Sequence, residues 1–142
     1  MKIKWVDELS IGVDEIDEQH KEIFERTATL VKASYSSKIT KEVKESVQFL
    51  VDYTKLHLKD EEKFMKKHGY PDYEEHKKLH IIFKQKVEDI DEALNFEGAT
   101  LKNILIVSRI FIQWVTRHIT IEDKKFATFL HTENKGNSSS SH

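Results

Sequence analysis

The chain has 142 residues, of which 38% are hydrophobic and 34% charged, and this balance suits one soluble domain with a single core. Its net charge of −2 gives no electrostatic footprint for nucleic acid, and the lack of cysteine excludes disulfides, iron–sulfur clusters, thiolate zinc sites and cysteine nucleophiles. Since we find neither an unbroken apolar run of membrane-spanning length nor the apolar core of a signal peptide, we expect no membrane span and a cytoplasmic location.

The N-terminal residues 1–13 carry scattered apolar positions without a helical period, and we expect an extended arm there. Four amphipathic helices are predicted after the arm, because apolar residues then recur at spacings of three and four. Side chains that can cap a helix N-terminus stand near each start: Asp14 or Asp17, Thr40, Asp72 in a capping box with Glu75, and Thr100.

Polar or glycine-containing breaks at 34–38, 68–71 and 95–99 separate the four predicted helices, and Gly69 suits the left-handed position past a helix end. Such short connections predict an all-α, up-down-up-down four-helix bundle. A short C-terminal helical segment that contains Phe126, Phe129 and Leu130 is expected to fold back onto the bundle. The predicted domain is 1–133, and the Ser-rich residues 134–142 are expected to be a flexible tail, linker or vector remnant.

Ionisable side chains interrupt the apolar stripes of all four predicted helices. Five histidines and one glutamate occupy stripe positions, and one aspartate follows them: His20, His57, Glu61, His76, His80, His118 and Asp123. A single such histidine is more often bonded to a backbone carbonyl, but burying this many without a central charge would leave several unpaired. Because all seven fall at the same end of an antiparallel bundle, we predict a bound metal as their common partner.

The spacing of these residues matters for the geometry of the site. His57 and Glu61, like His76 and His80, are four residues apart and so share one helix face. His118 and Asp123 are five residues apart and would diverge by about 140° on a regular helix. We therefore expect the backbone to leave regular helix geometry between Ile119 and Glu122.

Five imidazoles and two carboxylates suit a first-row transition metal, and these residues alone leave iron, manganese, zinc and copper open. Seven ligands are too many for one ion. If both carboxylates and one oxygen bridge two six-coordinate ions, one coordination position is left vacant, which suits a small diatomic ligand. The Glu-x-x-His motif of the carboxylate-rich di-iron oxidases does not occur in this sequence.

The order and spacing of the motifs resemble the hemerythrin family over about residues 5–131: His20, then H-x3-E at His57 and Glu61, H-x3-H at His76 and His80, and H-x4-D at His118 and Asp123. The resemblance implies two irons bridged by Glu61, Asp123 and an oxo or hydroxo group. It assigns His76, His80 and His118 to one iron. It assigns His20 and His57 to the other, which keeps an open position for reversible O2 binding.

By the same resemblance, Trp114, Val115 and Ile119 line the O2 pocket, and we expect Phe24 and Leu58 to face them. None of these five side chains is an acid or base, which favours a carrier, store, delivery protein or sensor of O2 over an enzyme. A di-iron peroxidase, oxidase or nitric oxide scavenger and an iron or redox sensor domain remain as alternatives.

Other features of the sequence are secondary to this prediction. We expect His68 and His131 to be solvated, His142 to belong to the tail, and Glu62 and Glu122 to be surface acids. The oligomeric state is left open, as is a signalling or oxygenase partner joined by fusion or interaction. A fold that starts soon after Met1 favours a stand-alone protein.

Overall fold

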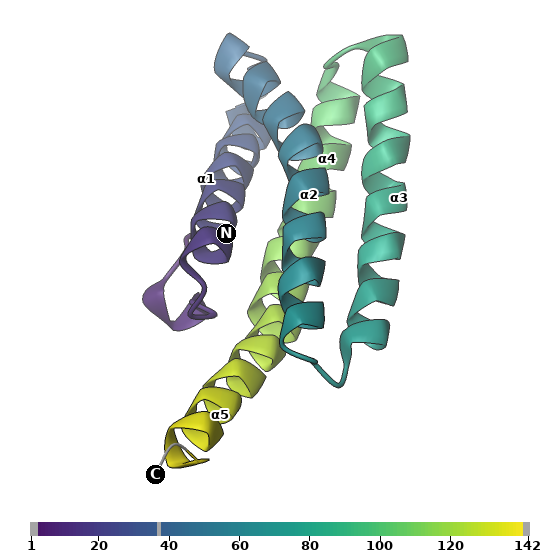
Figure 1. The fold of residues 1–142 in the computed structure, drawn as a ribbon. Helices are drawn as coiled ribbons and strands as arrows, with labels where there is room; N and C mark the ends of the chain where they lie inside the picture. The colour runs from purple at the N-terminus through teal and green to yellow at the C-terminus, as the bar shows by residue number, and fades with distance from the viewer. Residues whose placement is uncertain (1–2, 37, 141–142) are drawn as a thin grey trace.

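The computed structural model describes residues 3–36 and 38–140, with side chains as far as Glu133. Over these residues the fold is all-helical, and the predicted four-helix bundle is confirmed (Figure 1). The elements are a short 3-10 turn in the N-terminal arm (Asp7–Leu9), α1 (Asp14–Ser36), α2 (Lys41–Lys67), α3 (Tyr73–Glu97), α4 (Leu101–Gln113), the π-helix η2 (Trp114–Asp123) and α5 (Lys124–Ser140). Each bundle helix packs against its two neighbours, and α4 closes the bundle against α1.

Two of the predicted helix caps are formed. Thr40 Oγ1 accepts a hydrogen bond from the Val43 backbone N–H at 3.2 Å, and Thr100 Oγ1 accepts one from Asn103 at the same distance. Each threonine thus satisfies one of the backbone donors that a helix start leaves without a partner. Gly69 adopts the predicted left-handed conformation, with φ of 63°, just past the end of α2.

The predicted capping box at Asp72 is not formed. Asp72 is the N-cap of α3, but its side chain accepts no capping hydrogen bond. Its backbone, with φ of −93° and ψ of 18°, lies near the helical region instead of the extended conformation of a side-chain N-cap.

Asp17 has a different role from the predicted helix cap, because α1 already begins at Asp14. The Asp17 carboxylate is buried, and it accepts hydrogen bonds from the Ser10 hydroxyl and from the Ile11 backbone N–H, the latter at 2.8 Å. These bonds fix the N-terminal arm to the first turn of α1.

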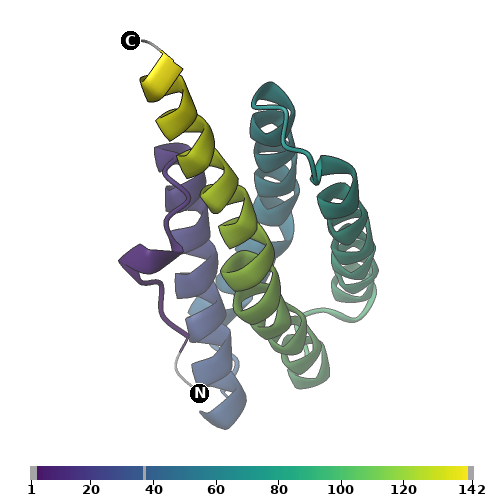
Figure 2. The same cartoon turned by 90° about the horizontal axis from the view of Figure 1, so that it is seen from below.

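α4, η2 and α5 form one continuous rod, so the prediction that the C-terminal segment folds back is wrong (Figure 2). Phe126 and Leu130 are buried although the chain does not turn. The rod extends past the bundle, where the arm and the ends of α1 and α2 supply an apolar surface. There Phe126 and Leu130 join a small cluster that includes Ile11, Ile16, Met65 and Tyr70.

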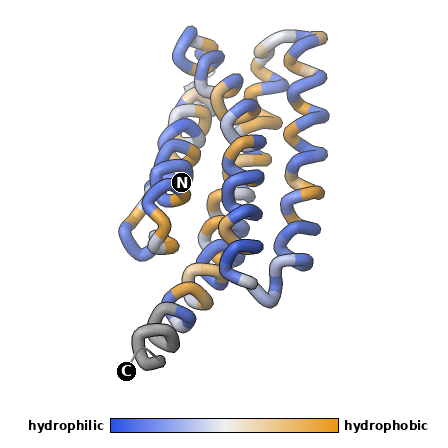
Figure 3. The backbone as a smooth tube through the Cα atoms, in the orientation of Figure 1, coloured by the Kyte–Doolittle hydropathy of each residue, from blue (hydrophilic) through white to orange (hydrophobic). Residues whose placement is uncertain are grey.

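The apolar core is divided along the bundle axis. Hydrophobic and hydrophilic positions alternate along each helix (Figure 3), and the buried apolar residues form two clusters. The main cluster draws its residues from all four bundle helices and from η2, and the small cluster lies where the rod passes the ends of α1 and α2. On α1, Ile16 belongs to the small cluster and Ile23 to the main one, and His20 lies between them. A polar layer therefore separates the two apolar clusters.

The helical run Leu101–Glu133 is long and apolar enough, by length and composition, to cross a membrane. However, it supplies Phe111 and Val115 to the main core cluster and Phe126 to the small one. A core helix of a bundle passes the same length and composition test, so this run is weak evidence for a membrane span.

The C-terminal residues bear on the predicted domain boundary. The backbone of α5 is helical as far as Ser140, through most of the predicted tail, and the last two residues lie outside the described part of the chain. The division into a domain of 1–133 and a tail of 134–142 stays a prediction.

The role of Asp17 predicts a loss of stability on substitution. Asp17→Asn weakens two hydrogen bonds to a buried carboxylate, and we expect it to lower the free energy of unfolding of the metal-free protein by about 1 to 3 kcal/mol. Asp14→Asn, at an exposed position of the same turn, should change it by no more than about 0.5 kcal/mol. Urea unfolding measures both, and equal losses would contradict the role given to Asp17.

Candidate metal centre

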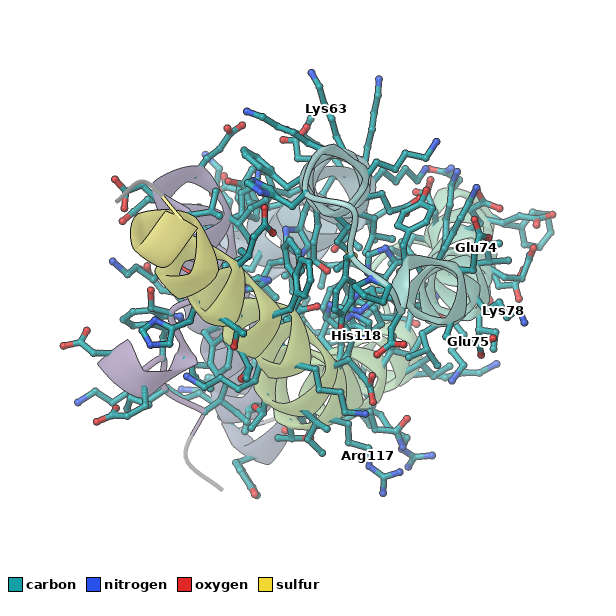
Figure 4. All side chains as sticks on the ribbon, turned by 60° about the horizontal axis from the view of Figure 1, so that its bottom comes forward. Lys63, Glu74, Glu75, Lys78, Arg117 and His118 are labelled. Carbon is teal, nitrogen blue, oxygen red and sulfur yellow. The ribbon has the colours of Figure 1, made fainter. Side chains whose placement is uncertain are left out.

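The structure gathers all seven predicted ligands in the polar layer between the two apolar clusters. They come from α1, α2, α3 and η2, and none is more than 5% exposed: His20, His57, Glu61, His76, His80, His118 and Asp123. Figure 4 shows His118 pointing inward among the helices, whereas its neighbour Arg117 points outward. The prediction that these seven side chains lie close together in the core is confirmed.

The seven side chains form two overlapping groups, in each of which the candidate ligand atoms lie within 4.8 Å of one another. The three-histidine group consists of His76, His80 and His118 with Glu61 and Asp123. The two-histidine group consists of His20 and His57 with the same Glu61 and Asp123. Both carboxylates are therefore shared, as expected for two neighbouring cations with bridging carboxylates.

The π-helix η2 brings His118 and Asp123 together. A π-helix closes its hydrogen bonds over five residues, so side chains five apart come to the same face. The His118 Nε2 atom lies 3.1 Å from Asp123 Oδ1. The predicted departure from regular helix geometry between Ile119 and Glu122 is confirmed, and it extends over the whole of Trp114–Asp123.

The histidine rings turn their Nε2 atoms toward the centre of each group. The Nε2 atoms of His20 and His57 are 3.2 Å apart, and His118 Nε2 lies 3.0 Å from that of His76 and 3.1 Å from that of His80. Within the described residues, Glu61 Oε2 and both Asp123 oxygens are buried without a hydrogen-bond donor in suitable geometry. Ring nitrogens that converge within each group, beside buried carboxylate oxygens without donors, fit a cation in each group.

The electrostatics of the layer also favour positive charge. Burial lowers the pKa of His20 and His76, but contacts with Asp123 and Glu61 outweigh it and raise these values to about 9 and about 10. His57 differs, since burial and the charge of His20 lower its pKa to about 3.

The two carboxylates respond in the opposite direction. Burial raises the pKa of Glu61, but the surrounding histidines, with His118 foremost, hold it well below its usual range. Burial and the charge of Glu61 raise the pKa of Asp123, and His118 and His20 reverse that effect and leave it lowered. Without metal, protons on the histidines therefore supply positive charge beside two ionised carboxylates.

Two residues beyond the predicted ligands hold ligand rings in place. His57 Nδ1 donates to Gln19 Oε1 at 2.9 Å, and the Gln19 amide nitrogen donates to Asp60 at 2.8 Å. His80 Nδ1 donates to Glu62 Oε2 at 3.0 Å. Such contacts orient a metal-ligating histidine and fix the proton on the nitrogen that faces away from the metal.

The prediction that Glu62 is a surface acid is wrong. Glu62 points away from Glu61 on their own helix, but α3 packs on that side and brings His80 into reach. Its side chain is only 24% exposed. An acidic residue next to a predicted ligand was the available signal. For Gln19, the signal was a polar residue next to His20 at the start of the first stripe.

The other residues predicted to lie outside the site make no contact with the seven side chains among the described interactions. Glu122 Oε1 lies 3.4 Å from Lys125 Nζ. His68 Nδ1 lies 3.6 Å from Glu133 Oε1, and the side chains of His68 and Glu133 are both half-buried. His131 is exposed, as predicted, and His142 lies outside the described residues.

The structure places the predicted pocket residues in the main core cluster, where all five are buried: Phe24, Leu58, Trp114, Val115 and Ile119. Trp114 stacks against His118, with ring centroids 3.7 Å apart, and against Phe83, with centroids 3.6 Å apart. Trp114 thus lies against the three-histidine group. That these five residues line an O2 pocket stays a prediction.

Comparison with known proteins identifies the family. A family model described as the hemerythrin HHE cation binding domain matches residues 11–130. The chain belongs to the hemerythrin family. Hemerythrins are di-iron proteins, and the two overlapping ligand groups fit one iron each.

Sequence matches to related proteins cover most of the length of this chain. A bacteriohemerythrin of Stenotrophomonas maltophilia is 34% identical over 87% of this chain and 78% of its own. A bacteriohemerythrin of Clostridium acetobutylicum is 25% identical over 86% of this chain and 96% of its own. A myohemerythrin of Theromyzon tessulatum is 24% identical over 87% of this chain and 89% of its own.

The shared carboxylates predict different effects of two ligand substitutions in this hemerythrin. Glu61→Ala removes a ligand from both groups and should weaken binding of both ions, whereas His80→Ala should weaken mainly the ion of the three-histidine group. Anaerobic equilibrium dialysis with ferrous iron measures the iron bound per chain. His131→Ala, at an exposed position, is the control and should bind as much iron as the unmodified protein. Equal losses for Glu61→Ala and His80→Ala would contradict the shared-carboxylate geometry.

Proposed function

We propose that this chain binds O2 reversibly at its di-iron centre, as a carrier, store, delivery protein or sensor. The observation that carries the proposal is the inequality of the two ligand groups. If both carboxylates and one oxygen bridged two six-coordinate irons, the iron in the three-histidine group would be saturated, whereas the iron in the two-histidine group would keep an open position. A ferrous pair there would supply the electrons that O2 takes up on binding.

The apolar neighbours of the site support binding over turnover. Val115 and Ile119 are buried one turn before and directly after His118, in the same cluster as Phe24 and Leu58. These side chains exclude water and carry no proton that could be transferred to bound oxygen. Reversible release of O2 requires such surroundings, because a proton from a nearby side chain would commit the oxygen to reduction.

The location, the partner and the competing functions are proposed on the same basis. A cytoplasmic location fits a chain whose most apolar helix supplies the bundle core. A signalling or oxygenase partner that senses or uses O2 fits the function. Peroxidase, oxidase or nitric oxide scavenging activity and iron or redox sensing are the competing functions, and the following experiment separates them from O2 binding.

The test is oxygenation of the diferrous protein followed by sparging with argon. Visible charge-transfer bands that appear with O2, disappear under argon and return over several cycles are expected. Bands that do not reverse, together with continuous consumption of an added reductant, would indicate an enzyme. The absence of any O2-dependent band would contradict O2 binding.

The predicted pocket leads to a second test, the substitution Ile119→Glu. Ile119 is 1% exposed, so the new carboxylate would be held in the core beside the site and compete for the open position. We expect the O2-bound form to be lost about tenfold faster or more, the effect of a competing ligand worth about 1.4 kcal/mol.

Ile121→Glu is the matched control for this substitution, because Ile121 lies on the same π-helix but is 51% exposed. Its rate of loss should equal that of the unmodified protein. An unchanged rate in Ile119→Glu would place the pocket elsewhere.

A further inference from the structure

The two ligand groups differ in the charge of the outer partner that holds one of their histidines. In the three-histidine group, His80 Nδ1 bonds directly to the carboxylate of Glu62. In the two-histidine group, His57 Nδ1 bonds to the neutral amide of Gln19, and the nearest carboxylate of that chain of bonds, Asp60, lies beyond the amide. Each group thus has an outer carboxylate. In the three-histidine group it bonds to the ligand histidine directly, and in the two-histidine group it is separated from the ligand histidine by the Gln19 amide.

The direction of these hydrogen bonds is fixed by what each partner can do. An ionised carboxylate only accepts, so Asp60 takes its bond from the Gln19 amide nitrogen, and the amide oxygen of Gln19 must face His57. His57 is therefore the donor. Glu62 likewise accepts from His80. Both rings thus carry a proton on Nδ1, which leaves Nε2 as the nitrogen that can bind the metal.

We infer that Glu62 and Gln19 are positioning residues that make the two metal positions unequal. Glu62 places a full negative charge against one ligand of the three-histidine group. Gln19 holds the matching ring of the two-histidine group with a neutral amide and keeps Asp60 one bond further away.

This inequality has a consequence for metal binding. A carboxylate that accepts from the Nδ1–H of a ligating histidine makes that ring a stronger electron donor. The three-histidine position should therefore hold its cation more tightly and fill first. The two-histidine position, where the open coordination site is proposed, should bind the second ion more weakly.

The inference rests on the proposed two-metal site, but its test does not depend on O2. Zn2+ is redox-inert and diamagnetic, so zinc-loaded protein allows the Nδ1 protons of His57 and His80 to be followed by NMR. A hydrogen bond to a charged acceptor is shorter and stronger than one to an amide. We expect the His80 proton to resonate downfield of the His57 proton.

Glu62→Gln removes the charge and keeps an oxygen that can accept from His80. The His80 proton should move upfield, and the affinity for the first Zn2+ should fall about tenfold or more. Glu75→Gln is the matched control, because Glu75 is an exposed carboxylate on α3 that accepts a hydrogen bond from Lys78. It should change neither the resonance nor the affinity.

A second variant, Gln19→Glu combined with Asp60→Asn, moves the outer carboxylate of the two-histidine group into contact with His57 without changing the net charge. The new asparagine can donate to the new glutamate, so the bonding pattern is kept. The His57 proton should move downfield, and the affinity for the second Zn2+ should rise. This variant carries the test alone if Glu62→Gln does not fold.

The outcomes of the experiment are distinct. Opposite shifts in the two variants, with no shift in Glu75→Gln, support the inference. Shifts and affinities equal to those of the unmodified protein, or an effect of Glu75→Gln as large as that of Glu62→Gln, would overturn it. Failure of the unmodified protein to bind two Zn2+ would instead overturn the two-metal site.

Discussion

The fold depends on the burial of seven ionisable side chains in one layer between two apolar clusters. Charged and polar groups cost several kcal/mol in such surroundings unless each has a partner. Two shared carboxylates and five inward-facing imidazoles find that partner in cations at the centre of the layer. Because the site draws together α1, α2, α3 and η2, the free energy of metal binding also stabilises the folded bundle.

The π-helix shows how this constraint shapes the backbone. Regular helix geometry would point His118 and Asp123 to different faces, so a ligand would be lost from the layer. Ten residues of π-helix, Trp114–Asp123, bring the two side chains to one face. π-helical segments are rare in proteins, and those that occur are often found at functional sites, where the function offsets their poorer backbone geometry. The local structure here follows from the requirement to complete the site.

The main parts of this arrangement could be predicted from the sequence because they depend on periodicity within one helix. A spacing of four residues places His57 and Glu61, and likewise His76 and His80, on one helix face. The spacing of five residues between His118 and Asp123 requires a departure from regular helix geometry. Contacts between helices could not be predicted in the same way. Glu62 reaches His80, and Gln19 reaches His57, only because of how α1, α2 and α3 are rotated against one another. The direction of α5 likewise depends on an apolar surface built by distant segments.

The most direct test of the central claim is a crystal structure of the protein loaded anaerobically with ferrous iron, with the iron located by its anomalous scattering. Two iron peaks are expected, one among His76, His80 and His118 and the other beside His20 and His57, with Glu61 and Asp123 contacting both. A single peak, or iron bound outside this layer, would contradict the claim that a pair of cations holds the seven buried side chains together.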